Sequence, residues 1–182
     1  MVTSEVLSPR LDMNDVGTAP IFGDAATATV LGGSLSPVAD RAVAAVDRPV
    51  IAAKGESGDA LRVPSETERP VTMDGPKVYL EAVKAMMETL SASAENAELR
   101  PDSLDLYVPH QANQRIINAI RQRMKLEPHR MYSNIADNGN TSSSTIPLCL
   151  AELLPEHTAG EYWGLTAFGG GFTYGATLLR TL

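Results

Sequence analysis

The hydrophobic and polar positions of the chain alternate between the periods of helices and of strands. Between Lys77 and Ala94, apolar residues recur at steps of three and four, which predicts an amphipathic helix. Pro76 suits the first turn of this helix, where a backbone N–H has no intrahelical partner. Patterns of the same kind predict two further helices, over Gln111–Lys125 and Thr141–Leu154.

Runs of apolar and β-branched residues bounded by turn residues predict the strands. These are Val2–Leu7, Ala28–Leu35, Val43–Ala53 with a break at Arg48–Pro49, Leu104–Val108, Met131–Ile135, Glu161–Ala167 and Phe172–Leu182. The glycines at 169–171 form a tight turn between the last two, which predicts an antiparallel hairpin. Residues 52–74 are rich in turn residues and predict a surface loop region. Strands separated by helices predict one α/β domain over 1–182, with helices on both faces of a mixed sheet.

Two polar residues follow expected strands, where sites in α/β sheets lie. His110 follows Leu104–Val108, and Asn140 follows Met131–Ile135. An imidazole can donate to a carbonyl oxygen or act as a base, and a carboxamide can donate to an oxyanion or enolate. A hydrogen-bonded loop histidine and a turn asparagine are the alternative interpretations.

The remaining chemistry-bearing residues give weaker signals. The turn at 169–171 has backbone N–H groups free of side-chain cover, as an oxyanion hole requires, although most such turns are only turns. Cys149 lies among apolar residues in the middle of a predicted helix, which indicates a core residue and not a nucleophile. Three dispersed histidines and one cysteine do not form a metal-ligand set.

The net charge of −7 over 182 residues argues against broad binding to nucleic acids or membrane surfaces. The candidate basic patch consists of Arg115, Arg121, Arg123, Lys125 and Arg130, which equally fit a solvated helix face. The single cysteine excludes an intrachain disulfide framework. Without a signal peptide or a membrane-spanning stretch in the sequence, we expect a cytoplasmic protein.

Four ordered segments carry a resemblance to a known family. They are Ile21–Ala26, Val108–Asn113, Gly139–Ser142 and Ala167–Gly175. With them, essentially all of Val2–Leu182 resembles the C-terminal half of a β-ketoacyl-acyl carrier protein (ACP) synthase III, a thiolase-fold condensing enzyme. The resemblance implies the C-terminal half of a thiolase-like fold, with a five-stranded mixed sheet.

The resemblance also implies roles for individual residues. His110 and Asn140 would stabilise the thioester enolate formed when malonyl-ACP loses its carboxylate. Gly170 would supply a backbone N–H to the oxyanion hole, and Phe168 would line the pocket near the histidine. Asn113 would contact the pantetheine arm, and Arg115 would meet the carrier protein.

The largest departure from the family is the absence of the N-terminal half that bears the nucleophilic cysteine. The resemblance therefore implies that this half, ACP and acyl-CoA are partners, and that the chain forms an oligomer, such as a dimer. No resident cofactor is expected, because the substrates are carried on CoA or on the ACP phosphopantetheine. Smaller departures are Ala25–Thr27, where the family usually has Gly-Ala-Gly, and Pro76, where a polar ligand-contacting residue is usual.

Three functions are open at this point. The first is the decarboxylative condensation of an acyl thioester with malonyl-ACP, as in fatty acid biosynthesis, with the cysteine supplied by the other half. The second is a non-decarboxylating acyl transfer in polyketide or other secondary metabolism, with His110 as general base. The third is a non-catalytic partner subunit.

Overall fold

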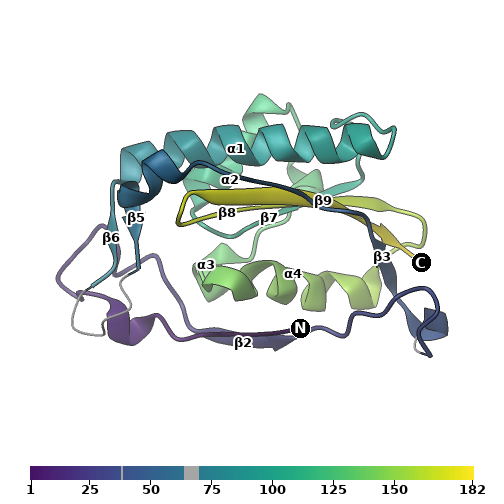
Figure 1. The fold of residues 1–182 in the computed structure, drawn as a ribbon, viewed down its shortest axis with the longest axis horizontal. Coiled ribbons are helices and arrows are strands. Elements are labelled where there is room, and N and C mark those ends of the chain that lie inside the picture. Colours follow the sequence, from purple (N-terminus) through teal and green to yellow (C-terminus); the bar gives the residue numbers. More distant parts are fainter. Residues whose placement is uncertain (38, 64–69) are drawn as a thin grey trace.

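A five-stranded mixed sheet forms the centre of the computed structural model, which describes residues 1–37, 39–63 and 70–182 (Figure 1). The strand order is β3–β9–β8–β7, and β4 also pairs with β9. The strands are β3 (Ala44–Val46), β4 (Val50–Ala53), β7 (Leu106–Pro109), β8 (Tyr162–Gly169) and β9 (Thr173–Thr181).

The directions of the strands agree with the pattern of the sequence. β8 and β9 form the expected antiparallel hairpin, and β7 runs parallel to β8. β3 pairs with the end of β9 at 179–181, whereas β4 pairs with its start at 173–176. The predicted break at Arg48–Pro49 is confirmed, because it separates these two short strands along the same edge of β9.

Helices cover both faces of the sheet, as predicted. α1 (Gly75–Asn96) and α2 (Gln114–Arg123) lie on one face, whereas α3 (Ile135–Asn138) and α4 (Thr145–Leu153) lie on the other (Figure 1). α1 begins as expected with Pro76 in its first turn, and the Asp74 side chain accepts a hydrogen bond from the backbone N–H of Lys77.

Alternate residues of the strands feed two cores, as the period of two requires. Tyr107 of β7 and Leu178 of β9 belong to the cluster packed against α1 and α2. Val108 and Leu179, their neighbours in sequence, belong to the cluster on the α4 side, which also holds Trp163. A strand between two cores is held from both faces, so its end is a firm place for a functional side chain.

A separate two-stranded sheet lies beyond α4 (Figure 1). It pairs β1 (Val2–Glu5) with β2 (Ala25–Ala28) in antiparallel register. The predicted strand at Ala28–Leu35 is wrong: the strand lies at Ala25–Ala28, because its partner β1 pairs with these four residues and begins at Val2, opposite Ala28. The small residues of β2 become a strand through this pairing and not through their own propensity.

The described residues of the region 52–74 contain short strands and buried side chains, where the sequence predicted a surface loop region. β5 (Leu61–Arg62) pairs with β6 (Thr72–Met73), and Ser57 and Ala60 are buried. Residues 64–69 of this expected loop lie outside the described residues. Within the described ranges, no helix is long and apolar enough to cross a membrane.

The strand predicted at Met131–Ile135 is also wrong. Only one isolated bridge forms there, between Tyr107 and Met131, and the chain then enters the short helix α3. The apolar residues of this segment pack under the core as a connection, with Met131 buried. The other two helices start later than predicted, at Gln114 and Thr145, because a turn precedes the first and a 3-10 helix (Ser142–Ser144) precedes the second.

Candidate active site

His110 stands directly after β7, at the strand end where the sequence predicted it. Its backbone N–H donates to the carbonyl of Thr166 at 2.7 Å, which continues the pairing of β7 with β8 by one residue. The chain then turns sharply, because the N–H of Ala112 donates back to the His110 carbonyl at 2.8 Å. The side chain is thereby carried on a backbone that is hydrogen-bonded on both sides.

Gln111 holds this turn and was not assigned a role from the sequence. Its side chain is fully buried, and its Nε2 donates to the Pro109 carbonyl at 2.7 Å. Its Oε1 accepts from the Ser133 hydroxyl at 3.0 Å and from the Asn134 backbone N–H at 3.2 Å. A buried amide with all these partners links the His110 loop to the 133–134 segment. In the sequence, the signal that could have identified Gln111 was its position between His110 and Asn113.

The imidazole of His110 is half-buried and contacts a hydroxyl on the opposite layer. Its Nδ1 lies 2.6 Å from Oγ1 of Thr145, the first residue of α4. Burial lowers the pKa of the His110 imidazole to about 4, because the charged form loses hydration there. The ring is therefore neutral at neutral pH.

Asn140 reaches the site by a different route from the one predicted. It follows α3 and Gly139 and no strand precedes it, so the expected pair of neighbouring strand ends is wrong for this residue. Instead, the segment pairs with the turn before β2: the N–H of Asn140 donates to Ile21 O at 2.8 Å, and the N–H of Gly23 donates to Asn140 O at 3.0 Å. The β1–β2 layer therefore positions Asn140.

Glycine is required on both sides of this pairing. A Cβ at Gly23 would lie 2.2 Å from the carbonyl oxygen of Asn138, closer than any side chain can approach. Gly139 has φ of +68°, a backbone conformation that L side chains rarely adopt. The segments 21–26 and 139–142, which carry the family resemblance, are thus paired with each other by backbone hydrogen bonds.

The carboxamide of Asn140 is oriented by the turn that follows it. Its Oδ1 accepts from the Ser142 backbone N–H at 3.0 Å, which leaves Nδ2 as the donor end of the amide, with one N–H directed to the Ala112 carbonyl and one available to a ligand. Nδ2 lies 3.4 Å from the carbonyl of Ala112, two residues after His110. The side chain is 8% exposed, so it meets only what enters the site.

The six residues assigned from the sequence line one cavity of about 750 Å³. They are His110, Asn113, Arg115, Asn140, Phe168 and Gly170. A smaller hollow of about 360 Å³ lies against His110 and Phe168 as well. The structure brings these residues together around one cavity, and their roles stay predictions.

Two of these residues also serve the fold. Asn113 is the N-cap of α2, and its Oδ1 accepts from the backbone N–H of Arg115 at 2.8 Å. Its amide nitrogen is therefore the group that can donate to a ligand. Phe168 packs on Phe172, with ring centroids 4.6 Å apart, so its position at the end of β8 is fixed by the turn that contains Gly170.

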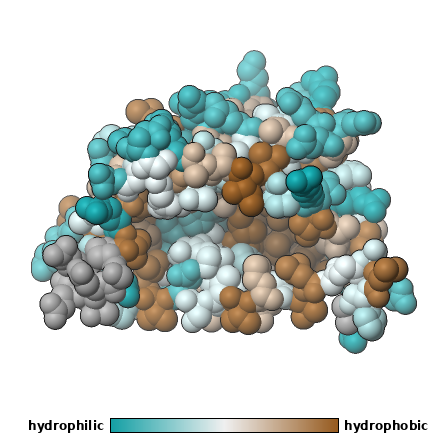
Figure 2. Space-filling view, in the orientation of Figure 1, coloured by the Kyte–Doolittle hydropathy of each residue, from teal (hydrophilic) through white to brown (hydrophobic). Residues whose placement is uncertain are grey.

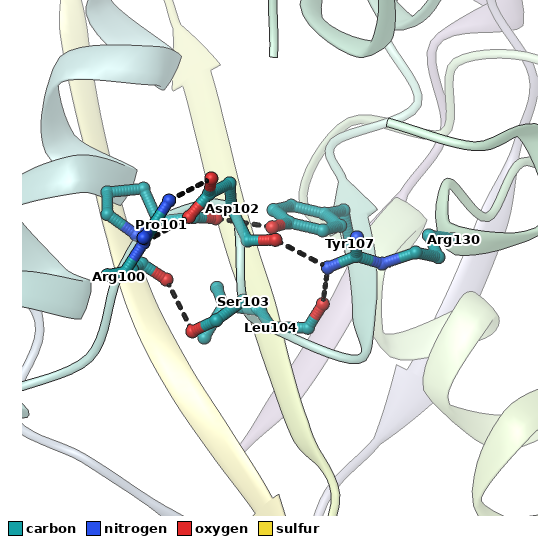
Figure 3. Close-up of polar contacts among 7 residues, drawn as sticks. All are labelled: Arg100, Pro101, Asp102, Ser103, Leu104, Tyr107 and Arg130. Carbon is teal, nitrogen blue, oxygen red and sulfur yellow. Dashed lines mark hydrogen bonds and ion pairs between the residues drawn. The ribbon is translucent and has the colours of Figure 1, made fainter. Parts of the chain in front are cut away.

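Arg130 does not belong to the basic patch in which the sequence placed it. Its guanidinium donates to the carbonyls of Asp102 and Leu104 and lies over the ring of Tyr107, 5.6 Å from the centroid (Figure 3). It anchors the loop before β7, at the opposite end of the strand from His110. Arg115 and Arg123 of α2 are exposed, so the patch is confined to that helix and the turn after it.

Cys149 is a core residue, as predicted. It is fully buried, and burial raises the pKa of its thiol to about 12. Its Sγ donates to Oδ1 of Asn134 at 3.3 Å. Across residues 1–37, 39–63 and 70–182, no three His, Cys, Asp or Glu side chains gather in a way that could hold a metal ion.

Two family models match the chain. Residues 94–181 match the model described as 3-oxoacyl-[acyl-carrier-protein] synthase III C terminal, and residues 1–46 match the model described as 3-oxoacyl-[acyl-carrier-protein] synthase III. The chain belongs to the 3-oxoacyl-ACP synthase III family. The resemblance carried by the four motifs is confirmed, and the second match covers the first 46 residues, which the resemblance already included. Neither match identifies a separate polypeptide as a partner, so that expectation stays a prediction.

Curated relatives and solved structures agree with the family. A β-ketoacyl-ACP synthase III of Oleidesulfovibrio alaskensis is 36% identical over 199 residues, which cover 100% of this chain and 58% of the relative. The 3-oxoacyl-ACP synthase III structure from Pseudomonas aeruginosa has a TM-score of 0.84 and 31% identity, over 99% of this chain and 56% of that chain. The priming β-ketosynthase of the R1128 polyketide pathway has a TM-score of 0.80 and 27% identity, over 99% and 56%. The thiolase-like α/β fold is confirmed, and the chain spans a little over half the length of these relatives.

Proposed function

We propose that this chain carries the histidine–asparagine part of a site for decarboxylative Claisen condensation of an acyl thioester with malonyl-ACP. The observation that supports this most is the single cavity shared by His110, Asn140, Phe168 and Gly170. A cavity of about 750 Å³ has the size of a small-molecule site, and it has few polar groups on a largely apolar wall. This arrangement suits a flexible thioester arm with one reacting carbonyl.

Asn140 is the residue best placed to hold the thioester oxygen. When malonyl-ACP loses carbon dioxide, negative charge moves to this oxygen, and the enolate carbon attacks the acyl group. The carboxamide Nδ2 faces the cavity from a backbone that is fixed on both sides, so it can donate without rearrangement. His110 lines the same cavity from the end of β7, where it would meet the same reacting group.

In this proposal, the acyl group is carried by a cysteine of the N-terminal half, because this sequence holds one cysteine, Cys149. Cys149 does not fit that role, because it is fully buried and its pKa is raised to about 12. The backbone N–H of Gly170 would serve the oxyanion of the acyl-cysteine step. No resident cofactor is proposed, because the substrates arrive on CoA or on the phosphopantetheine of ACP.

The surface supports a partner that covers the β1–β2 side. Exposed large apolar residues gather there and on the neighbouring connections; they include Val2, Val6, Val16, Val30, Leu31 and Leu35. Figure 2 shows hydrophobic residues along the side on which β2 lies, whereas hydrophilic residues cover α1. An apolar surface of this kind marks an interface. We assign it to the nucleophile-bearing N-terminal half of the thiolase-like pair, on the same or another polypeptide.

The carrier protein is proposed to approach over α2. Arg115 lines the cavity and is exposed, and Arg123 continues the same helix in a chain of net charge −7. Local basic groups in an acidic chain provide an attraction for an acidic partner. The dimeric assembly and the cytoplasmic location expected from the sequence stay predictions.

The test supplies this chain with a cysteine-bearing N-terminal half from a family member and follows β-ketoacyl-ACP formation. The proposal predicts product from acyl-CoA and malonyl-ACP together, with release of carbon dioxide. Product formation from an acceptor that lacks a carboxylate, at an equal rate, would instead support a non-decarboxylating acyl transfer. Assembly of the two halves without any product would support a non-catalytic subunit.

A further inference from the structure

The glycine turn at 169–171 rests on a segment from another part of the chain. Residues 54–60, here called the brace, include the 3-10 helix Gly55–Ala60, which lies beside the first turns of α1 (Figure 1). At Lys54 the pairing of β4 with β9 continues by one residue. The N–H of Lys54 donates to the carbonyl of Phe172 at 2.8 Å, and its carbonyl accepts from the N–H of Phe172 at 3.1 Å. The backbone thus ties the brace to the end of the turn.

The brace is itself anchored to α1 at both of its ends. At the first end, Nζ of Lys54 lies 2.6 Å from Oε1 of Glu81, and both side chains are mostly shielded from water. At the other end, the carbonyl of Ala60 accepts from the backbone N–H of Asp74, the N-cap of α1, at 2.8 Å. Ala60 is also buried in the core cluster of this face. The brace is therefore a fixed support for the turn.

Gly58 is the point at which the brace comes closest to the turn. A Cβ at Gly58 would lie 2.6 Å from the carbonyl oxygen of Gly171, whereas ordinary contacts begin at 3.4 Å. Any side chain there would force the two segments apart by about 0.8 Å. The φ of Gly58 is not left-handed, so the contact alone requires glycine. At Gly55, in the same short helix, no atom of the described residues lies within 4 Å of the Cβ position.

The turn is the segment that would yield to such a side chain. Gly169 and Gly170 line the cavity of about 750 Å³, so the turn has open space in front of it. At Gly169, the Cβ position has no neighbour within 4 Å among the described residues. We propose that Gly58 is a positioning residue: its bare Cα lets the anchored brace hold the Gly170 N–H at the place where it donates to the reacting carbonyl.

The consequence for the reaction rests on the proposed function. The carbonyl oxygen of the acyl thioester takes up an electron pair when the cysteine sulfur attacks. It returns this pair when CoA leaves with the proton that the cysteine thiol released. A donor stabilises this oxygen at about 2.7–3.1 Å, so a displaced Gly170 N–H should lower kcat by about 10- to 100-fold. KM should stay within about twofold, because α2 and its cavity residues are untouched.

The first test is a displacement and needs no activity. Crystal structures of the full chain are compared for the wild type, Gly58→Ala and Gly55→Ala, after superposition on β7, β8 and β9. The proposal predicts that the Gly170 nitrogen moves by more than half of the ~0.8 Å in Gly58→Ala and stays in place in Gly55→Ala. A Gly58→Ala structure in which the brace moves and the turn does not would overturn the proposal, whatever the activity.

The second test is kinetic and uses the chain reconstituted with a cysteine-bearing N-terminal half. Gly58→Ala should lose kcat at an unchanged KM, and Gly55→Ala should keep both. Equal kcat values for these two variants, with the turn in place in both, would contradict the positioning role. A displaced turn with full kcat would instead reject the donor role of Gly170, which belongs to the proposed function.

A second set of variants decides if Gly58→Ala does not fold. Lys54→Met removes the ion pair with Glu81 without adding an atom to the contact, and Lys54→Arg keeps the charge. Lys84→Met is the matched control, because it removes an exposed pair with Glu88 on the same helix. The proposal predicts a fall in kcat of about twofold or more for Lys54→Met alone, with KM unchanged. Equal kcat in all three variants would overturn the anchoring of the brace.

Discussion

The two ends of strand β7 differ in how their polar groups are used. At the amino end, the groups between Arg100 and Tyr107 are paired with one another (Figure 3). The Tyr107 hydroxyl donates to the Pro101 carbonyl, the guanidinium of Arg130 binds two further carbonyls, and Arg100 pairs with Asp102 through two hydrogen bonds. Such a cluster has nothing left to offer a ligand.

At the carboxyl end, each side chain is held through one edge and keeps hydrogen-bonding capacity on the other, although one N–H of Asn140 Nδ2 donates to the Ala112 carbonyl. His110 is held through Nδ1, and Asn140 is held through Oδ1. The remaining edges, Nε2 and Nδ2, face the space that both residues line. The comparison shows that paired polar groups anchor the amino end of β7. This anchoring leaves the polar side chains at the carboxyl end available to bind a ligand.

Removing the imidazole at the carboxyl end is expected to have the largest effect. His110→Ala should lower the rate of condensation by about 10²- to 10⁴-fold, the usual contribution of a positioned acid or base. Stability should fall by about 1 kcal/mol, because the alanine removes the imidazole partner of the buried Thr145 hydroxyl. Product formation and urea unfolding measure the two effects, with His129→Ala as an exposed control. A His110→Ala variant with undiminished condensation would show that His110 has no role in the reaction.

At the amino end, Arg130→Met should act on stability alone. The change removes two charge-assisted hydrogen bonds and a cation–π contact with Tyr107. It should lower the free energy of unfolding by about 2 kcal/mol, with Arg123→Met on the exposed face of α2 as the matched control. Condensation per folded molecule should be unchanged. A loss of activity without a loss of stability would instead show that Arg130 takes part in the function, as a member of the basic patch.

Tyr107→Phe is the milder change at the same end. It deletes the hydroxyl that donates to the Pro101 carbonyl and keeps the buried ring. The expected loss is about 1 kcal/mol, close to the net value of one hydrogen bond. Differential scanning calorimetry should show a transition a few degrees lower. An equal or higher transition temperature would show that this contact does not stabilise the loop.

A further expected effect is a pH dependence of stability at the carboxyl end. The pKa of His110 is lowered to about 4 in the folded chain from 6.5 in an exposed histidine. Between pH 6.5 and pH 4 the unfolded state therefore binds the extra proton and the folded state does not, so stability falls as the pH falls through this window. Urea unfolding at several pH values between 4.5 and 7 gives the free energy of unfolding as a function of pH. This free energy should depend less steeply on pH in His110→Gln than in the wild type. Equal slopes would contradict the lowered pKa.

The fold could be predicted where local pattern and tertiary pairing agree. α1 follows from its apolar spacing, and the β8–β9 hairpin follows from two apolar runs around three glycines. The residue types of segments 28–35 and 131–135 favour strands, but neither segment finds a pairing partner along its length. The strand β2 forms at Ala25–Ala28 opposite β1, and Met131 forms one bridge to Tyr107. Propensity cannot show such partners, because they are distant in sequence.

The site was predictable as a set of residues and not as a set of contacts. The family motifs identified His110 and Asn140, but the route by which Asn140 arrives depends on a pairing with residues 21–23. Thr145 was hidden at the end of a run of hydroxyl residues, where any of them could have capped the helix. Its contact with a histidine 35 positions away is visible only in three dimensions.

The most direct test of the account is a titration of the ¹⁵N-labelled chain with a malonyl-pantetheine thioester, followed by NMR. The account predicts that the His110 ring signals and the Asn140 side-chain amide shift together, with one dissociation constant. The Tyr107 backbone amide and the Arg130 side-chain signals should stay in place. Shifts confined to one of the two cavity residues, or larger shifts at the amino end of β7, would contradict a shared site for the thioester.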